Sequence, residues 1–118
     1  MQREEVLTVC AGKTGASKDY PFGDGVAVFK VAGKTFALVS LDDHVGQVSL
    51  KCDPELALAL RTLHPAVTPG FHLNKRHWNS VTLDGSIDEE LLAEMIDDSY
   101  DLVVGKLPKA VRERLLSR

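Results

Sequence analysis

The sequence of 118 residues lacks the features that mark secreted, membrane-bound or metal-stapled proteins. Its two cysteines, Cys10 and Cys52, are too few for a disulfide scaffold or a four-thiolate metal site. The longest uninterrupted apolar run is five residues, 56–60, which is far short of a membrane span, and the N-terminus has no apolar signal-peptide core. We therefore expect one cytoplasmic domain over residues 1–118, with free thiols and no membrane partner.

Catalytic and cofactor signatures are also missing. The chain contains no G-x-S-x-G, P-loop or G-x-G-x-x-G pattern, and Cys10 lies on an apolar helix stripe, as a packed thiol does. His72 and His77 are five residues apart, and Cys52 is a conceivable third metal ligand, but no standard ligand spacing supports a site. The carboxylates of Asp97, Asp98 and Asp101 fit a solvated helix face. We expect neither catalysis nor a bound metal or cofactor.

The net charge of −3 conceals an uneven distribution. Residues 1–83 carry nine basic against eight acidic side chains, whereas residues 84–118 carry five against nine. No acidic residue occurs between positions 56 and 83, and no lysine or arginine occurs between 84 and 101. Charged helix faces are often simply solvated, so this asymmetry is a weak pointer to a partner. It does remove the objection that a slightly acidic protein cannot bind a polyanion.

The N-terminal half predicts one helix and three strands. Apolar spacing indicates a helix over residues 3–11 and a loop over 12–25, in which Tyr20-Pro21-Phe22-Gly23 has the composition of a turn anchored by buried aromatic rings. Strands are expected at residues 27–31, 35–41 and 45–52, with a tight turn at Ala32-Gly33 between the first two. This register assigns one face of the hairpin to Phe29, Val31, Phe36 and Leu38, and the other to Lys30, Thr35 and Ala37.

The C-terminal half predicts a helix, a hairpin and two further helices. Asp53-Pro54 begins the first helix, whose buried stripe is Leu56, Leu60 and Leu63 and which Pro65 ends. Extended segments at 71–73 and 78–83 are expected to form a hairpin with the basic tip 74–77. A capping box, Ser86-x-x-Glu89, opens a long helix that runs to Gly105, and Pro108 starts a short terminal helix.

This element order predicts a two-layer α+β fold. Strands joined by tight turns form an antiparallel sheet, helices cover one face of it, and the other face is left to solvent. The expected order is helix, three strands, helix, two strands, helix and a terminal helix. Alternation along the strands gives the outward positions as Lys30, Thr35, Gln47, Ser49, Lys51, Trp78, Ser80 and Thr82.

The chain resembles the MmcQ/YjbR family of small bacterial proteins over nearly its whole length. The resemblance lies in these segments: Pro21-Phe22-Gly23, Val28-Phe29-Lys30 to Gly33-Lys34-x-Phe36-Ala37, Leu50-Lys51-Cys52-Asp53-Pro54-Glu55, Pro69-Gly70-x-His72-x-Asn74-Lys75-x-His77-Trp78-Asn79 and Ser99-Tyr100-Asp101-Leu102-Val103. It implies a frataxin-like (CyaY-like) or secretion-chaperone-like α+β fold and DNA binding through a double wing of basic hairpins. It implies no enzymatic activity.

The hairpin tip is the best candidate for a binding site. The candidate residues are His72, Asn74, Lys75, Arg76, His77 and Trp78, extended by Lys30, Lys34 and Lys51. Cations neutralise phosphates, an indole stacks on a base or sugar, and asparagines add hydrogen bonds. We expect duplex DNA as the partner, bound weakly, with a salt slope near −0.9 for each of about five or six phosphate contacts. A purely structural role is the alternative, in which Trp78 caps the sheet while His72 and Asn74 fix the turn.

The acidic helix predicted over residues 88–101 bears on this hypothesis. It would repel DNA if it lay beside the hairpin, so DNA binding requires it to lie on the far layer. The same helix, or the open sheet face, offers a docking surface for a protein, and a non-catalytic protein-interaction module is the rival function. We expect a monomer or a weak dimer in either case.

Overall fold

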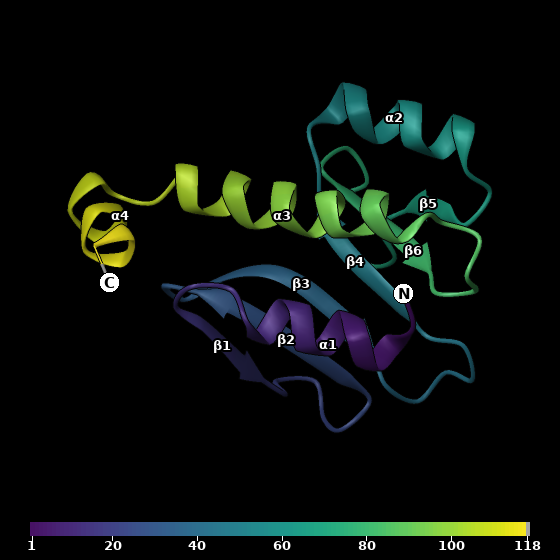
Figure 1. The fold of residues 1–118 in the computed structure, drawn as a ribbon, viewed down its shortest axis with the longest axis horizontal. Coiled ribbons are helices and arrows are strands. Elements are labelled where there is room, and N and C mark those ends of the chain that lie inside the picture. The colour runs from purple at the N-terminus through teal and green to yellow at the C-terminus, as the bar shows by residue number, and fades with distance from the viewer. Residues whose placement is uncertain (118) are drawn as a thin grey trace.

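The computed structural model describes residues 1–117, which form one antiparallel sheet and four helices (Figure 1). The helices are α1 (Arg3–Ala11), α2 (Pro54–Leu63), α3 (Glu89–Gly105) and α4 (Lys109–Leu116). The strands are β1 (Ala16–Asp19), β2 (Val26–Val31), β3 (Lys34–Ser40), β4 (Gln47–Lys51), β5 (Val67–Pro69) and β6 (Trp78–Thr82). They lie in the order β1-β2-β3-β4-β6-β5. The α+β class expected from the sequence is confirmed.

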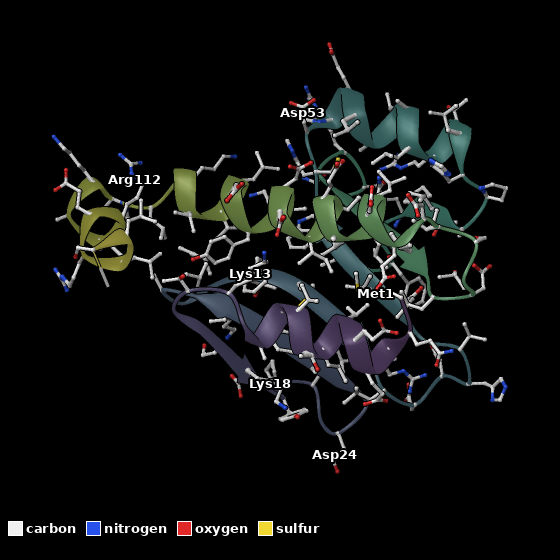
Figure 2. All side chains as sticks on the ribbon, in the orientation of Figure 1. Met1, Lys13, Lys18, Asp24, Asp53 and Arg112 are labelled. Carbon is white, nitrogen blue, oxygen red and sulfur yellow. The ribbon has the colours of Figure 1, made fainter. Side chains whose placement is uncertain are left out.

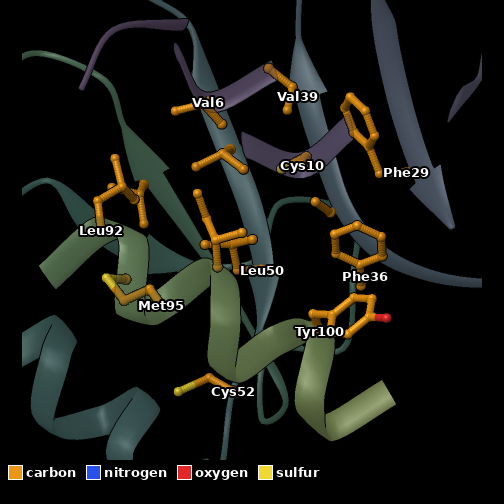
Figure 3. Packing of buried hydrophobic residues seen from close by; sticks show 14 of the residues in the cluster. Val6, Cys10, Phe29, Phe36, Val39, Leu50, Cys52, Leu92, Met95 and Tyr100 are labelled. Atoms are coloured by element: carbon orange, nitrogen blue, oxygen red, sulfur yellow. The ribbon is translucent and has the colours of Figure 1, made fainter. Parts of the chain in front are cut away.

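Three helices cover the same face of the sheet. Helix α1 packs on β1 and β3, α3 on β2 to β4, and α2 on β5 and β6. In Figure 1 α1 and α3 cross in front of the strands, and α4 lies beyond the end of the sheet. The core between the layers includes Phe29, Phe36 and Tyr100, whose rings pack in sequence with centroids 6.3 and 5.4 Å apart (Figure 3). No helix within residues 1–117 is long and apolar enough to cross a membrane.

Local chemistry explains several element boundaries. Asp53 accepts a hydrogen bond from the amide of Glu55 at 3.1 Å, and Pro54 occupies the first helical position of α2, as predicted. At the turn between β2 and β3, Ala32 and Gly33 both have positive φ, 50° and 79°, which is the type I′ geometry that suits a two-residue hairpin. At α3 the predicted capping box is wrong, because Ser86 bonds to Asp84 at 2.6 Å instead and Asp88 precedes the helix.

A β-bulge in β3 changes which residues face the helices. Phe29 pairs with Ala37 and Lys30 pairs with Thr35, so Phe36 is an extra residue with no partner on β2. Phe36 and Ala37 are both buried in the core, and Leu38 turns to the opposite face, where it pairs with Ser49. The predicted faces of Leu38 and Ala37 are therefore wrong, because strict alternation does not anticipate the extra residue.

Strand assignments differ from the prediction at two places. The expected loop 12–25 contains β1, an edge strand whose polar sequence shows no alternation and which is defined by its pairing with β2. The strand that forms the hairpin with β6 is β5, Val67–Pro69, whereas residues 71–73 form part of a loop. The hairpin exists, but its connection is residues 70–77 rather than a four-residue tip.

Apolar side chains are also less buried than the sequence suggests. On α2 the buried residues are Ala57 and Leu60, while Leu56 and Leu63 are 42% and 70% exposed, so the expected leucine stripe is confirmed at Leu60 and wrong at the other two positions. The small side chain of Ala57 faces the sheet, and its carbonyl accepts a hydrogen bond from the Asn79 amide. Tyr20 and Phe22 form a turn but are exposed, at 43% and 72%, rather than anchored by burial.

Candidate nucleic-acid interface

The open face of the sheet carries two lysines and a tryptophan near one end. Lys30 pairs with Thr35, and Lys51 pairs with Trp78. Leu50 pairs with Ala37, so Lys51, the next residue on β4, lies beside the bulge in β3. We name Lys30, Thr35, Lys51 and Trp78 the cationic row. Because neighbouring strands lie about 4.8 Å apart, the row crosses four strands within roughly 15 Å. The sequence placed all four residues on this face correctly.

The two lysines of the cationic row have different electrostatic surroundings. The Lys30 ammonium lies 3.7 Å from the Asp19 carboxylate, and both groups are accessible to solvent, so the ion pair is weak. Burial lowers the pKa of Lys51, and the positive charge of Lys106 at the end of α3 lowers it further. An anion bound at Lys51 would offset both effects, because a nearby negative charge favours the charged form of a lysine.

Arg61 of α2 holds the loop 70–77 against the sheet. Its Nε donates to the side-chain oxygen of Asn79 at 2.7 Å, and its terminal nitrogen donates to the carbonyl of Trp78 at 3.3 Å and to that of Lys75. Asn79 is 1% exposed, so the guanidinium supplies a partner for a buried amide. Sequence reasoning missed Arg61, because the residues it bonds lie 14 to 18 positions away.

Several predicted site residues serve the loop itself. The Asn74 side chain accepts a hydrogen bond from the amide of Arg76 at 3.0 Å, and its carbonyl accepts from the amides of His77 and Trp78. Lys75 Nζ donates to the carbonyl of Gly70 at 3.0 Å. Asn74 thus has the structural role that the sequence left open, and Lys75 has one that the sequence did not predict, while Arg76 is exposed at the tip.

A groove of about 400 Å³ lies on the open face beside the cationic row. Val26, Leu38 and Ser49 belong to its floor strands, and its rim is formed by loop residues Phe22 and Phe71. The remaining lining residues are Ser40, Gln47, His72 and Leu73. His72 has a φ of 59°, and its ring centroid lies 4.0 Å from that of Phe71. Its ring therefore packs on an aromatic side chain, in place of the predicted role in fixing the turn.

The sequence missed this groove because its rim comes from two separate loops. Phe22 was expected to be buried in a turn, and Phe71 was assigned to a strand. Outward alternation did place Gln47 and Ser49 on this face, so the floor was partly visible in the sequence. The apolar part of the floor could not be predicted, because Leu38 faces outward only as a result of the bulge in β3.

Helix α3 lies on the layer opposite the cationic row, but its residue Asp98 lines the same small cavity as Lys51 at the end of β4. Helix α3 packs on the helix-covered face of β2, β3 and β4, and Lys13 at the end of α1 pairs with Asp97 (Figure 2). Lys34 pairs with the core residue Val31, so it lies on the helix-covered face of the sheet and does not extend the cationic row. The DNA hypothesis requires the acidic helix to lie on the far layer, and α3 lies there except that Asp98 is close to Lys51.

The two cysteines show no sign of catalytic activation. Burial raises the pKa of Cys10 to about 12, and burial together with the nearby carboxylates of Asp53 and Asp98 raises that of Cys52. A nucleophilic cysteine needs the opposite shift. Within residues 1–117 there is no group of three His, Cys, Asp or Glu side chains arranged to hold a metal ion.

The fold and this surface define a small α+β domain with one helix-covered sheet face and one open face that is partly cationic. The YjbR family model matches residues 11–102, and the chain belongs to the YjbR family. It is 38% identical to Escherichia coli K12 YjbR over 98% of both chains, and 42% identical to YbdF of Escherichia coli O157:H7 over 81% of this chain and 79% of that protein. Both relatives are described as uncharacterized.

Solved structures share this fold. A Deinococcus radiodurans protein with a DUF419 domain superposes with a TM-score of 0.91 at 39% identity, covering 97% of this chain and 87% of that one. A crystal structure of a Pseudomonas syringae protein gives a TM-score of 0.75 at 29% identity, covering 86% of this chain and 98% of that one. The family resemblance expected from the sequence motifs is confirmed.

Proposed function

We propose that the protein is a non-catalytic DNA-binding module that uses the open sheet face. The observation that carries this proposal is the cationic row, in which Lys30, Lys51 and Trp78 lie together on the face opposite α3. Ammonium groups neutralise phosphates, and an indole next to them stacks on a base or packs on a sugar. The description of the family as DNA-binding, implied by the sequence resemblance, points to the same ligand.

The proposed site is centred on the sheet rather than on the hairpin tip. Lys75 bonds the loop backbone and Lys34 lies on the other face, so the main phosphate ligands of the proposed site are Lys30, Lys51 and Arg76. With about three contacts, the logarithm of duplex affinity is expected to fall with the logarithm of the salt concentration at a slope of roughly −2.7. Asp19 reduces the contribution of Lys30, so the binding is weak even at low salt.

The proposal is tested by fluorescence anisotropy with a labelled duplex at low salt. Lys30→Ala combined with Lys51→Ala is expected to weaken binding at least tenfold and to make the salt slope shallower by about 2. Lys109→Ala combined with Arg112→Ala is the matched control, because it removes the same charge from α4, beyond the end of the sheet. Absence of binding by the wild type at micromolar concentration, or an equal loss in the control, would overturn the proposal.

The rival function, a protein-interaction module, is favoured by a different observation. Leu58 and Leu63 of α2 are 61% and 70% exposed, so this helix presents apolar side chains that a protein partner would cover. This function predicts a co-purifying partner that resists nuclease and is lost with Leu58→Ser and Leu63→Ser. Charge reversal at Glu94 and Asp97 tests the version in which the acidic helix is the docking face. A nuclease-sensitive partner supports DNA binding instead.

A further inference from the structure

The groove beside the cationic row has features that binding to a duplex backbone does not require. Its volume of about 400 Å³ is in the range of small-ligand pockets, roughly 300–1,000 Å³. Phe22 and Phe71 on its rim are 72% and 64% exposed. Phenyl rings left in solvent forfeit a large burial energy, and exposed aromatic rings are the stacking surfaces of nucleic-acid binding proteins.

Some hydrogen-bonding side chains in the groove are bonded to other protein groups, and others are not. Ser40 accepts the amide of Gln47 at 2.8 Å, and Ser49 shares a 2.8 Å hydrogen bond with Ser80. The side-chain amide of Gln47 and the imidazole of His72 have no hydrogen-bond partner within the part of the chain that the structure describes. A carboxamide presents a donor and an acceptor side by side, which is the pattern that pairs with the edge of a nucleobase.

Charge is segregated between the groove and the cationic row. None of the groove-lining residues is a lysine, arginine, aspartate or glutamate, whereas Lys51 follows the groove residue Ser49 by two positions on β4. Two residues along a strand span about 7 Å. The surface therefore fits a ligand with a planar uncharged part in the groove and a negative charge a few ångströms away. A nucleotide unit of a single strand has this form.

We propose that the groove binds an unpaired base of single-stranded DNA, with Phe22 and Phe71 contacting the base and Lys51 the adjacent phosphate. This inference rests on the proposed DNA-binding function and names the form of DNA bound. In a duplex the bases are stacked and paired inside the helix, so they cannot enter the groove, whereas a splayed base in a single strand can.

The test compares three labelled probes with equal numbers of phosphates: a thymidine oligonucleotide, a duplex, and a single strand of abasic sites. The thymidine strand is expected to bind about tenfold tighter than the abasic strand, since stacking by one aromatic side chain contributes roughly fivefold to over a hundredfold. It is also expected to bind tighter than the duplex. Quenching of Trp78 fluorescence gives a second, label-free readout.

Variants locate the binding to the groove. Phe71→Ala is expected to lower affinity for the thymidine strand about tenfold and to leave the abasic strand unchanged. Leu63→Ala is the matched control, because Leu63 is similarly exposed but lies on α2 away from this face. Lys51→Ala is expected to weaken binding of all three probes, because it acts on phosphate.

The outcomes separate the two proposals. If duplex and abasic strands bind as tightly as the thymidine strand and Phe71→Ala has no effect, the groove has another occupant and this inference is wrong, while DNA binding stands. If no probe binds, the proposed function itself fails. Because Phe71 is exposed, its variant should retain the thermal midpoint of the wild type, so a loss of binding cannot be attributed to unfolding.

Discussion

The two faces of the sheet are built from the same strands but follow different rules. On the helix side Val39, Val48 and Val81 are fully buried and pack in one continuous core. On the other side Lys30, Lys51 and Trp78 are only half-buried, and an open groove lies beside them. This difference indicates that the helix-covered face contributes most of the free energy of folding, so residues on the open face are available to bind a ligand. The following variants test that division, in order of decreasing effect.

The largest effect is expected from truncating equivalent rings on the two faces. Phe36 is fully buried between Phe29 and Tyr100, so Phe36→Ala should lower the free energy of unfolding by about 3–5 kcal/mol. Phe71→Ala, at a 64% exposed position, should change it by no more than about 0.5 kcal/mol. Urea denaturation of both variants measures the contrast. Similar losses in the two would mean that the open face also stabilises the fold.

A smaller loss is expected at the contact between α3 and the sheet. Ser99 is fully buried; its hydroxyl donates to the carbonyl of Phe36 at 2.6 Å and accepts from the amide of Lys51 at 2.8 Å. Ser99→Ala leaves both groups without this partner and should cost about 1–3 kcal/mol. Ser117→Ala, which removes an exposed hydroxyl at the end of α4, is the control. An unchanged urea midpoint for Ser99→Ala would contradict the assignment.

The smallest change in stability is expected at Lys51, with an opposite change in binding. Because burial and Lys106 lower its pKa below 10.5, the folded state disfavours the ammonium relative to the unfolded state. Lys51→Met removes that cost, so the variant should be at least as stable as the wild type at neutral pH, while it binds DNA more weakly. The stability difference should shrink as the pH rises from the lowered pKa through 10.5, where both states become neutral. Thermal melts across this range measure it, and a destabilised variant would indicate a structural lysine.

Features set by neighbouring residues were predictable from the sequence. The bounds of α1, the turn at Ala32-Gly33 and the Asp53-Pro54 start of α2 depend on local capping and turn chemistry, and all three agree with the structure. Features that depend on distant partners were not predictable. Strand β1 exists because it pairs with β2, and the loop 70–77 has its conformation because Arg61 bonds it from another element.

The candidate site divides in the same way. Alternation was sufficient to place Lys30, Lys51 and Trp78 on the open face, because β2, β4 and β6 are regular at those positions. It failed at Leu38, where the bulge interrupts β3, and it gave no means of bringing Phe22 and Phe71 to one groove. From the sequence, Asn74, Lys75 and Arg76 were equal candidates for binding DNA. Only their hydrogen-bond partners in the structure show that Asn74 and Lys75 stabilise the loop.

The position of Ser99 gives the Lys51 amide an unusual exchange behaviour. Its N–H is satisfied by a side chain from the other layer rather than by a carbonyl of β3, so separating β3 from β4 alone does not release it. Exchange of this amide hydrogen with deuterated solvent then requires α3 to separate from the sheet, which exposes the hydrophobic core to solvent. The backbone at a lysine proposed to hold phosphate is thus expected to open as slowly as the core, so a ligand would meet it already in place.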